Sequence, residues 1–372
     1  MNPKPERAPE WQEEFHPSTG AYVAATGLVA SVYVYFLIFA QFGFLRALTT
    51  VLGEGHAWFR PVLLVMAVAG IGGGFGAARL FTERRGRALI MAGLVLAGLA
   101  VALTWVAATP ELFLLAAFLT GAGTGIVTVT LAGLLRREIG GARLGYCIGL
   151  ATGLAYAVCN LPPVFRGDIK TQLLVAIGAV CAGLVAVQGL EQRAPHQTID
   201  GIDYGPVGRW VWVAVFLVLV ATDSAVFYVI QHTPELKQAT WEVGTQLCLN
   251  AAAHLAGAVL AGLALDRRHV AGTLFVAAVL LAGASLLLGL GIVNGVVATL
   301  YAAAVSGYST ALVFYPARSG RPALAAILFS VAGWLGSGLG LGLAERLHRI
   351  PVWLPLAAVV IIAALLAARP RK

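Results

Sequence analysis

Long hydrophobic stretches follow one another along almost the whole chain, and they constrain the fold more than any other feature. A helix needs about 20 apolar residues to cross roughly 30 Å of hydrocarbon. Twelve such stretches are expected near residues 21–46, 60–80, 87–108, 111–135, 144–165, 171–190, 209–231, 243–265, 270–293, 295–316, 322–344 and 351–368. The sequence therefore predicts an all-α integral membrane protein with twelve transmembrane helices.

The composition excludes an ordinary soluble domain. Of the 372 residues, 59% are hydrophobic and 11% are charged, whereas soluble domains carry about 25% charged residues. The longest remaining segments, 1–20 and 191–208, are too short to fold around cores of their own. We therefore expect no soluble catalytic domain, and we interpret the N-terminal segment as a solvated tail, with docking to a partner as the alternative.

Lysine and arginine are distributed unequally between the two sides of the predicted helices. Most of the 25 Lys and Arg residues fall in the segments that share a side with the N-terminus. The positive-inside rule then places both termini in the cytoplasm and the protein in the cell (cytoplasmic, or inner) membrane. The same bias accounts for the formal net charge of +8. Nucleic-acid binding is not expected, because no basic run is interleaved with aromatic residues on a soluble face.

Two similar turns rich in acid and arginine lie about half the chain apart. Glu83-Arg84-Arg85-Gly86-Arg87 joins the second and third predicted helices, and Asp266-Arg267-Arg268 joins the eighth and ninth. A repeat of this kind predicts two pseudo-symmetric six-helix bundles. The predicted division is an N-terminal cytoplasmic tail (1–20), a first bundle (21–190), a central cytoplasmic linker (191–208) and a second bundle (209–372).

These turns resemble the GxxxDRxGR motif of the major facilitator superfamily. The first copy has Glu83 in place of Asp and Arg79 where the leading Gly belongs, and the second keeps Gly262 and Asp266 but has His269 in place of Gly. The resemblance implies alternating access between two bundles, with the turns forming a cytoplasmic gate. The gate residues implied are Glu83, Arg84, Arg87, Asp266 and Arg267. A simple topology signal is the alternative interpretation.

Small residues recur on the helices that meet across the two bundles in the resembled family. The fifth predicted helix carries Gly145, Gly149 and Gly153 at four-residue spacing. The eighth carries small residues at the same spacing, and the second and eleventh are rich in glycine over 70–76 and 333–342. Since helices in lipid approach closely only where side chains are small, we expect these four helices to form the interface between the bundles.

Asp223 is the one acidic residue that falls well inside a predicted helix. It follows Arg209 by fourteen residues, or about 21 Å along the helix axis. An Asp at a helix centre costs about 2.5–3.5 kcal/mol on insertion scales, so an unneeded one is not expected there. We predict that Asp223 exchanges a proton or binds substrate. The alternative is a hydrogen-bonded Asp that packs the seventh helix, helped by Thr222 and Ser224.

A polar stripe follows on the eighth helix. Gln246, Asn250 and His254 are spaced by four residues and share one face. Such a stripe faces protein or a water-filled cavity. His254 could exchange a proton, with Asp223 or water as its partner. The alternative is hydrogen bonding between the halves, worth about 0.6 kcal/mol per contact.

Hydroxyl groups complete the predicted central site. In the resembled family the first, fourth, seventh and tenth helices line the cavity, which implies roles for Tyr35, Thr124, Tyr301 and Tyr308. Threonines of this kind often bond only to their own helix backbone, and Tyr315 could sit in an interfacial aromatic belt. No Lys or Arg reaches the middle of a predicted helix, which favours a neutral, aromatic or cationic solute over an anionic one.

The function predicted first is secondary active transport of a small solute by alternating access, with Asp223 as the candidate for proton coupling. The alternative is a non-transporting membrane subunit or assembly factor that binds a partner complex or handles a hydrophobic cofactor. No HExxH or GxSxG motif supports an enzyme. No cofactor or metal is expected, because the four cysteines lie inside predicted helices without a CxxC spacing.

Overall fold

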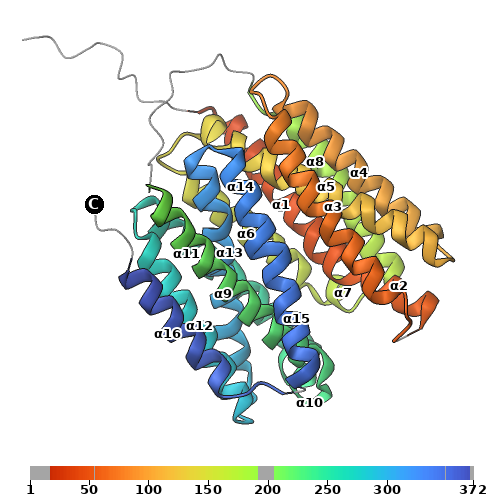
Figure 1. Ribbon diagram of the computed structural model, residues 1–372, viewed down its shortest axis with the longest axis vertical. Helices are drawn as coiled ribbons and strands as arrows, with labels where there is room; N and C mark the ends of the chain where they lie inside the picture. Colours follow the sequence, from red (N-terminus) through yellow and green to blue (C-terminus); the bar gives the residue numbers. More distant parts are fainter. Residues whose placement is uncertain (1–16, 54, 192–204, 348, 369–372) are drawn as a thin grey trace, which may run out of the picture.

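The chain folds almost entirely into helices (Figure 1). The computed structural model describes residues 17–53, 55–191, 205–347 and 349–368, with side chains described from 208 onward in the third segment. Most of the predicted tail (1–16) and linker (192–204) therefore lie outside the described residues.

The first half of the chain runs from α1 to α8. Its helices are α1 (Thr19–Val34), η1 (Tyr35–Gly43), α2 (Phe44–Leu52), α3 (Phe59–Leu80), α4 (Gly86–Val106), α5 (Pro110–Ile139), α6 (Leu144–Cys159), α7 (Pro162–Phe165) and α8 (Ile169–Gln188). The first predicted helix is continuous from α1 through α2, with the π-helical segment η1 in its middle.

The second half of the chain runs from α9 to α16. Its helices are α9 (Gly205–His232), α10 (Pro234–Lys237), η2 (Gln238–Glu242), α11 (Gly244–Asp266), α12 (Val270–Gly289), α13 (Gly295–Ser319), α14 (Pro322–Leu328), η3 (Phe329–Leu335), α15 (Gly336–Leu347) and α16 (Trp353–Ala367). The π-helical segment η3 joins α14 to α15 in one continuous helical stretch.

Ten of these helical stretches are long and apolar enough to cross a membrane, within the part of the chain that the structure describes. Each matches one of the twelve predicted helices. The other two predictions correspond to apolar helices of ordinary core length, α6 with 16 residues and α16 with 15. α6 ends at Cys159, shortly before Pro162, because proline disfavours helical backbone at the residue before it, and Leu161 is extended.

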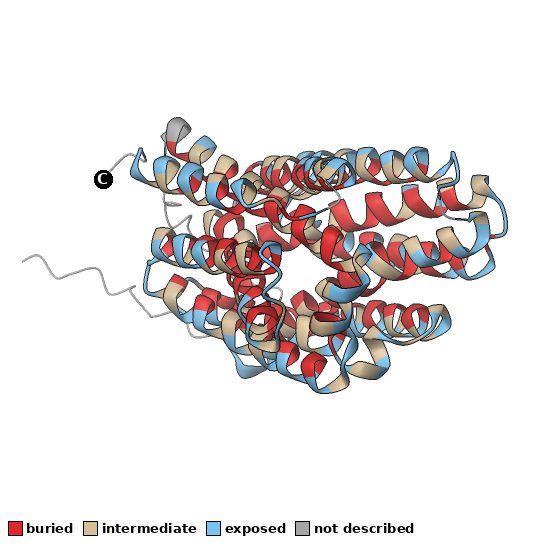
Figure 2. Cartoon of the chain, turned by 90° about the horizontal axis from the view of Figure 1, so that it is seen from below, coloured by how far each residue is buried: buried red, intermediate tan, exposed pale blue. Residues whose placement is uncertain are grey.

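The two halves of the chain lie side by side (Figure 1). Viewed from below, buried residues line the helix faces that point inward (Figure 2). Large apolar side chains such as Val23, Leu64 and Val185 are exposed on the outside. Because such a surface is unfavourable in water but suits hydrocarbon, this outward apolar face fits a membrane setting.

Glycine allows α6 and α11 to touch between the halves. A Cβ atom at Gly145 would overlap the carbonyl oxygen of Gly262, and one at Gly149 would overlap that of Ala258. Only glycine permits backbones this close, so the prediction for the fifth and eighth helices is confirmed by their contact.

The second and eleventh predicted helices also meet between the halves, since α3 packs against α14 and η3, although several of their glycines pack within their own halves. A Cβ at Gly125 of α5 would overlap the backbone of Gly70 on α3, and one at Gly340 of α15 would overlap the backbone of α9. Gly70 makes a contact across the halves, because the ring of Trp334 on η3 lies directly against it. These glycines therefore serve both kinds of contact, between helices of one half and, at Gly70, between the halves.

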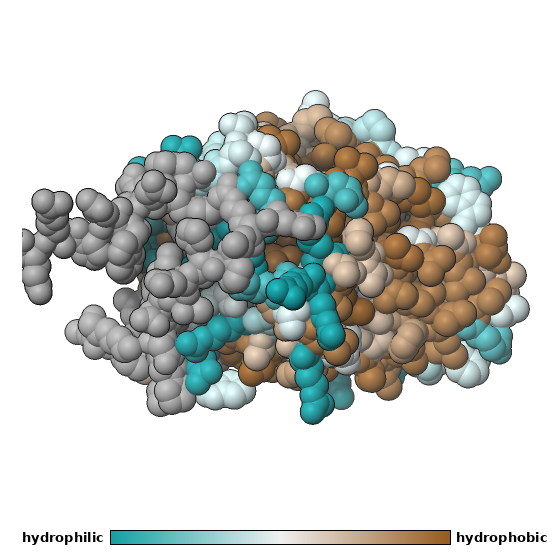
Figure 3. Space-filling model, turned by 90° about the horizontal axis from the view of Figure 1, so that it is seen from above, coloured by the Kyte–Doolittle hydropathy of each residue, from teal (hydrophilic) through white to brown (hydrophobic). Residues whose placement is uncertain are grey.

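One end of the molecule gathers the ends of helices from both halves, and we call it the linker face. It is defined by hydrogen-bonded or ion-paired residues at helix ends: Ser18, Glu83, Arg136, Glu138, Glu191, Asp266 and Arg318. Viewed from above, hydrophilic side chains occupy the middle of this face (Figure 3). The other end, which carries the Arg60–Glu345 ion pair, is the opposite face.

Candidate functional site

Asp223 of α9 is held by two tyrosines of α13. Its two carboxylate oxygens accept hydrogen bonds, one from the hydroxyl of Tyr301 and the other from the hydroxyl of Tyr308. The hydroxyl of Tyr301 also lies 3.2 Å from the backbone carbonyl oxygen of Asp223. The tyrosines are seven residues apart, two helical turns, so both project from the same side of α13. The structure thus brings together three residues that the sequence predicted separately.

Aromatic rings pack around Asp223, Tyr301 and Tyr308, which we call the Asp223 cluster. The ring of Trp241 on η2 meets the ring of Tyr301 edge to face at 5.6 Å between centroids, and it meets Phe227 of α9 in the same way at 5.7 Å. Tyr301 and Trp241 are almost fully buried, while Asp223 retains some exposure. The carboxylate therefore lies beside closely packed aromatic rings. Trp241 lies between two predicted helices, and nothing in its sequence pattern marked it as part of a site.

His254 of α11 is buried and has a different partner from the one predicted. Its Nδ1 atom lies 2.6 Å from the hydroxyl of Ser306 on α13, in place of the expected Asp223 or water. Its ring stacks on Tyr156 of α6, with centroids 4.4 Å apart and planes 7° from parallel. Because α6 belongs to the first half, this stack is a contact between the halves near the Asp223 cluster.

Two tyrosines of the first half meet α13 at the same level. The hydroxyl of Tyr156 lies 3.1 Å from that of Ser309, and the hydroxyl of Tyr33 on α1 donates to the Ser309 carbonyl oxygen at 3.3 Å. Sequence analysis overlooked Tyr33 and Tyr156. Their only signal was a tyrosine in the middle of a predicted helix. We call Tyr33, Tyr156, Trp241 and His254 the aromatic wall.

Gln246 and Asn250 serve packing inside the second half. The Gln246 amide donates to the Asn250 side chain at 2.8 Å and to the Gly295 carbonyl oxygen at 3.2 Å. The Asn250 amide donates to the carbonyl oxygen of Thr240 at 2.9 Å. These bonds tie α11 to η2 and to the start of α13. These bonds therefore do not support a role in a cavity for Gln246 or Asn250. The alternative, hydrogen bonding between the halves, is also corrected, because all three bonds lie within the second half.

Tyr35 and Thr124 lie together, but away from Asp223. Both line a cavity of about 10 Å³ between η1, α4 and α5, inside the first half. Both are buried, and neither hydroxyl makes a well-formed hydrogen bond with any residue in the described ranges. Their neighbours Thr120 and Thr128 donate to carbonyl oxygens of their own helix, as the alternative interpretation predicted. Tyr315, proposed for an interfacial belt, is instead buried between aromatic rings of α9.

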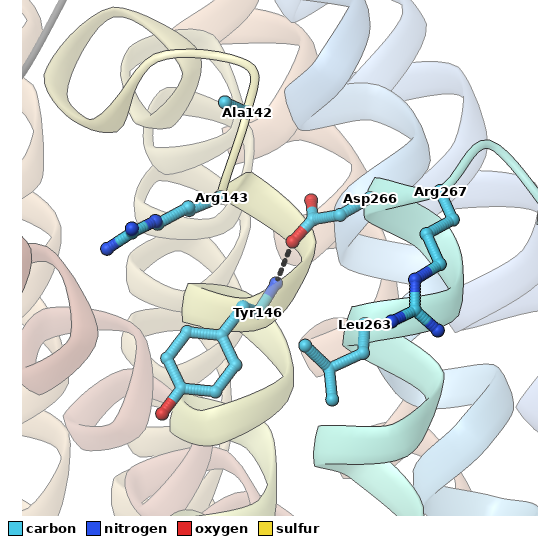
Figure 4. A pocket seen from close by; sticks show the side chains of 6 residues that line it. All are labelled: Ala142, Arg143, Tyr146, Leu263, Asp266 and Arg267. Carbon is cyan, nitrogen blue, oxygen red and sulfur yellow. Dashed lines mark hydrogen bonds between the residues drawn. The ribbon is translucent and has the colours of Figure 1, made fainter.

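Asp266 joins the halves on the linker face. Its carboxylate accepts hydrogen bonds from the backbone N–H groups of Gly145, at 2.6 Å, and Tyr146, at 2.8 Å. Figure 4 shows the bond from Tyr146. These residues form the first turn of α6, where N–H groups lack partners in the helix and the helix dipole favours a negative charge. The carboxylate at the end of α11 thus caps a helix of the other half.

Within the described ranges, the other predicted gate residues form no hydrogen bond or ion pair between the halves. Glu83 pairs with Arg137 at 2.8 Å, and Arg87 donates to the Val187 carbonyl oxygen at 2.8 Å, both within the first half. Arg84 and Arg267 are exposed. Sequence analysis overlooked one hydrogen bond between the halves. Arg136 of α5 donates it to the carbonyl oxygen of Arg318 at the end of α13, at 2.9 Å.

Comparison with known proteins rests on the shape of the fold. No protein-family model matches the chain, and no curated protein matches it. Solved structures match over nearly its whole length. The transporter FucP of the major facilitator superfamily, solved in an outward conformation, has a TM-score of 0.66 at 15% identity and covers 95% of this chain and 100% of its own. The chain has the major facilitator superfamily fold.

Two further structures agree. The E. coli fucose:proton symporter FucP, in a variant form, has a TM-score of 0.63 at 15% identity, covering 95% of this chain and 100% of its own. The human organic anion transporter MFSD10 has a TM-score of 0.63 at 13% identity, covering 93% of this chain and 97% of its own.

In the described part of the chain, no group of three or more His, Cys, Asp or Glu residues could hold a metal ion.

Proposed function

We propose that this protein is a secondary active transporter that moves a small neutral, aromatic or cationic solute by alternating access. The carrying observation is Asp223, a carboxylate inside a membrane-length helix that is held by two tyrosine hydroxyls. The fold supports the class of function, since transporters of the same superfamily share it. In this proposal α6 and α16 complete twelve spans, the bundles comprise 21–190 and 209–372, and both termini are cytoplasmic.

Asp223 is the proposed group for proton coupling or substrate binding. The hydroxyls of Tyr301 and Tyr308 stabilise the charged carboxylate by charge-assisted hydrogen bonds. A proton on one oxygen turns that oxygen into a donor, so that its hydrogen bond with one tyrosine hydroxyl must reverse direction or break. Binding or release of a proton would thus be felt on α13, which also contacts the first half through Ser309. The likeness to a fucose:proton symporter supports proton coupling as a hypothesis.

The surroundings of Asp223 favour the proposed class of solute. The aromatic wall places several rings in the region of a single carboxylate, a composition that suits cations and aromatic solutes. An anionic solute would meet Asp223 as a like charge. Hydroxyl groups on Tyr33, Tyr156 and Ser309 could orient polar groups of a neutral solute.

Asp266 is the proposed gate residue on the linker face. Its cap on α6 holds the two halves together there, and access from that side requires the cap to break. The other turn residues would act indirectly, by positioning the helix ends on the linker face; these residues are Glu83, Arg84, Arg87 and Arg267.

Proton movement in liposomes containing the purified protein tests the proposal. A panel of neutral, aromatic and cationic solutes is added, and wild type is compared with Asp223→Asn. We expect a solute-dependent proton flux that falls about a hundredfold or more in the variant, because loss of a proton-transfer group typically costs that much.

Asp168→Asn is the matched control. Asp168 is exposed and caps α8 through hydrogen bonds from Thr171, which hold the pKa of its carboxyl below its usual value. It therefore stays charged through the working range of pH, and Asn is an equally good cap. Flux that survives Asp223→Asn would refute the role of Asp223. Absence of flux with every solute, together with a partner that co-purifies at fixed stoichiometry, would favour the non-transporting subunit.

A further inference from the structure

A pocket opens on the linker face where the two halves meet. Its volume is about 420 Å³, and it is lined by Ala142, Arg143, Tyr146, Leu263, Asp266 and Arg267 (Figure 4). The first three residues belong to the start of α6 and the turn before it, and the last three belong to the end of α11. The pocket therefore lies over the Asp266 cap that joins the halves.

The charges around the pocket favour an anion. Arg143 lies on one side and Arg267 on the other, and both side chains are exposed (Figure 4). Neither makes an ion pair with any residue of the described ranges. Asp266 also lines the pocket, but both of its oxygens are already occupied by backbone N–H groups of α6. The lining thus carries a net positive charge, on two guanidinium groups whose planar donors suit phosphate.

Apolar side chains continue from the pocket along both helices. Tyr146 and Leu263 line it and are 39% and 38% exposed. On α6 the exposed residues Leu154 and Val158 continue the four-residue spacing that starts at Tyr146, and on α11 Leu260 lies one turn from Leu263. The ligand that fits is amphipathic, with an anionic head on the linker face and an apolar part on the spans.

We propose that this pocket binds the phosphate group of an anionic phospholipid, between Arg143 and Arg267, with an acyl chain along Tyr146 and Leu263. Basic pockets between transmembrane helices are a known way of holding anionic headgroups on the cytoplasmic side. Because one arginine comes from each half, a bound lipid strengthens the same contact that Asp266 makes. The lipid therefore favours the arrangement in which the linker face is closed.

Thermal unfolding of the full-length protein in detergent tests the binding directly. Phosphatidylglycerol or phosphatidylcholine is titrated into wild type, Arg143→Gln, Arg267→Gln and the double variant. The matched control is Arg85→Gln, which removes the same charge from an exposed position on the linker face outside the pocket. We expect phosphatidylglycerol to raise the unfolding temperature of wild type and Arg85→Gln. The apparent affinity should fall about tenfold in each pocket variant.

Two further arms separate the lipid from a soluble phosphate. Inorganic phosphate and glycerol phosphate should give no comparable shift, and Leu263→Gln should weaken the effect of phosphatidylglycerol. Equal protection by phosphatidylcholine, or an unchanged response in the double variant, would overturn the proposal. Equal protection by a soluble phosphate would overturn the lipid assignment. The binding measurement requires no transport, so its failure is distinguishable from failure of the proposed function.

Discussion

Around Asp223 and His254 in the second half, polar side chains bond to one another across helices, whereas around Thr124 in the first half they bond to their own helix or lack a well-formed bond among the described residues. Asp223 meets Tyr301 and Tyr308, and His254 meets Ser306. Tyr35 and Thr124 instead face a small cavity. Two halves with a repeated turn and similar helix lengths therefore differ in their chemistry. The first half contributes aromatic surface to the site, through Tyr33 and Tyr156.

Among changes that compare the two halves, the largest effect should follow from removing a hydroxyl that holds Asp223. Tyr301→Phe and Tyr308→Phe should each slow solute-dependent proton flux about tenfold or more, because a hydrogen bond to a charged group contributes about 1.5–3 kcal/mol. Tyr315→Phe makes the same chemical change on α13 away from Asp223 and should leave the flux within about twofold of wild type. Equal rates in all three variants would contradict the assigned role of the second half.

A smaller effect is expected on stability when the partner of His254 is removed. Ser306→Ala leaves a buried imidazole nitrogen without its hydrogen bond, which should lower the free energy of unfolding by about 1–3 kcal/mol. Ser285→Ala is the control, since its hydroxyl donates only to Leu281 of its own helix. Thermal unfolding in detergent gives the comparison. If both variants lose the same free energy of unfolding, the bond between α11 and α13 contributes no more to stability than a bond within one helix.

The corresponding change in the first half should have the opposite sign. Thr124→Val and Tyr35→Phe remove hydroxyls without well-formed bonds, so stability should stay unchanged or rise by up to about 1 kcal/mol. The same unfolding assay measures this. A loss of stability would show that the cavity of about 10 Å³ holds a bridging water. The two halves would then be more alike in their polar networks than they look.

The smallest effect belongs to the ion pair between the halves on the opposite face. Arg60 and Glu345 lie 3.0 Å apart, but their side chains are 83% and 43% exposed. Arg60→Gln should therefore change stability by less than about 1 kcal/mol, and added salt should reduce the difference. A larger or salt-insensitive loss would indicate that this face is held as firmly as the linker face.

The chemical character of single residues predicted members of the candidate site better than the spacing of polar residues did. The cost of a carboxylate in hydrocarbon singled out Asp223, and the rings of Tyr301 and Tyr308 share one side of a single helix. The stripe of Gln246, Asn250 and His254 was visible too, but its partners were not. Those partners are backbone carbonyl groups and a serine, which look alike at many positions along a sequence.

The amino-acid sequence by itself determined the helical membrane architecture, because hydrophobic length and charge are properties of local segments that read the same in any fold. The tertiary structure alone decided which side chains become partners: it stacked Tyr156 on His254, placed Asp266 on α6, and left Tyr35 and Thr124 away from Asp223. These contacts depend on how each helix is rotated and where glycine lets backbones approach. That rotation is set by the packing of all the helices together.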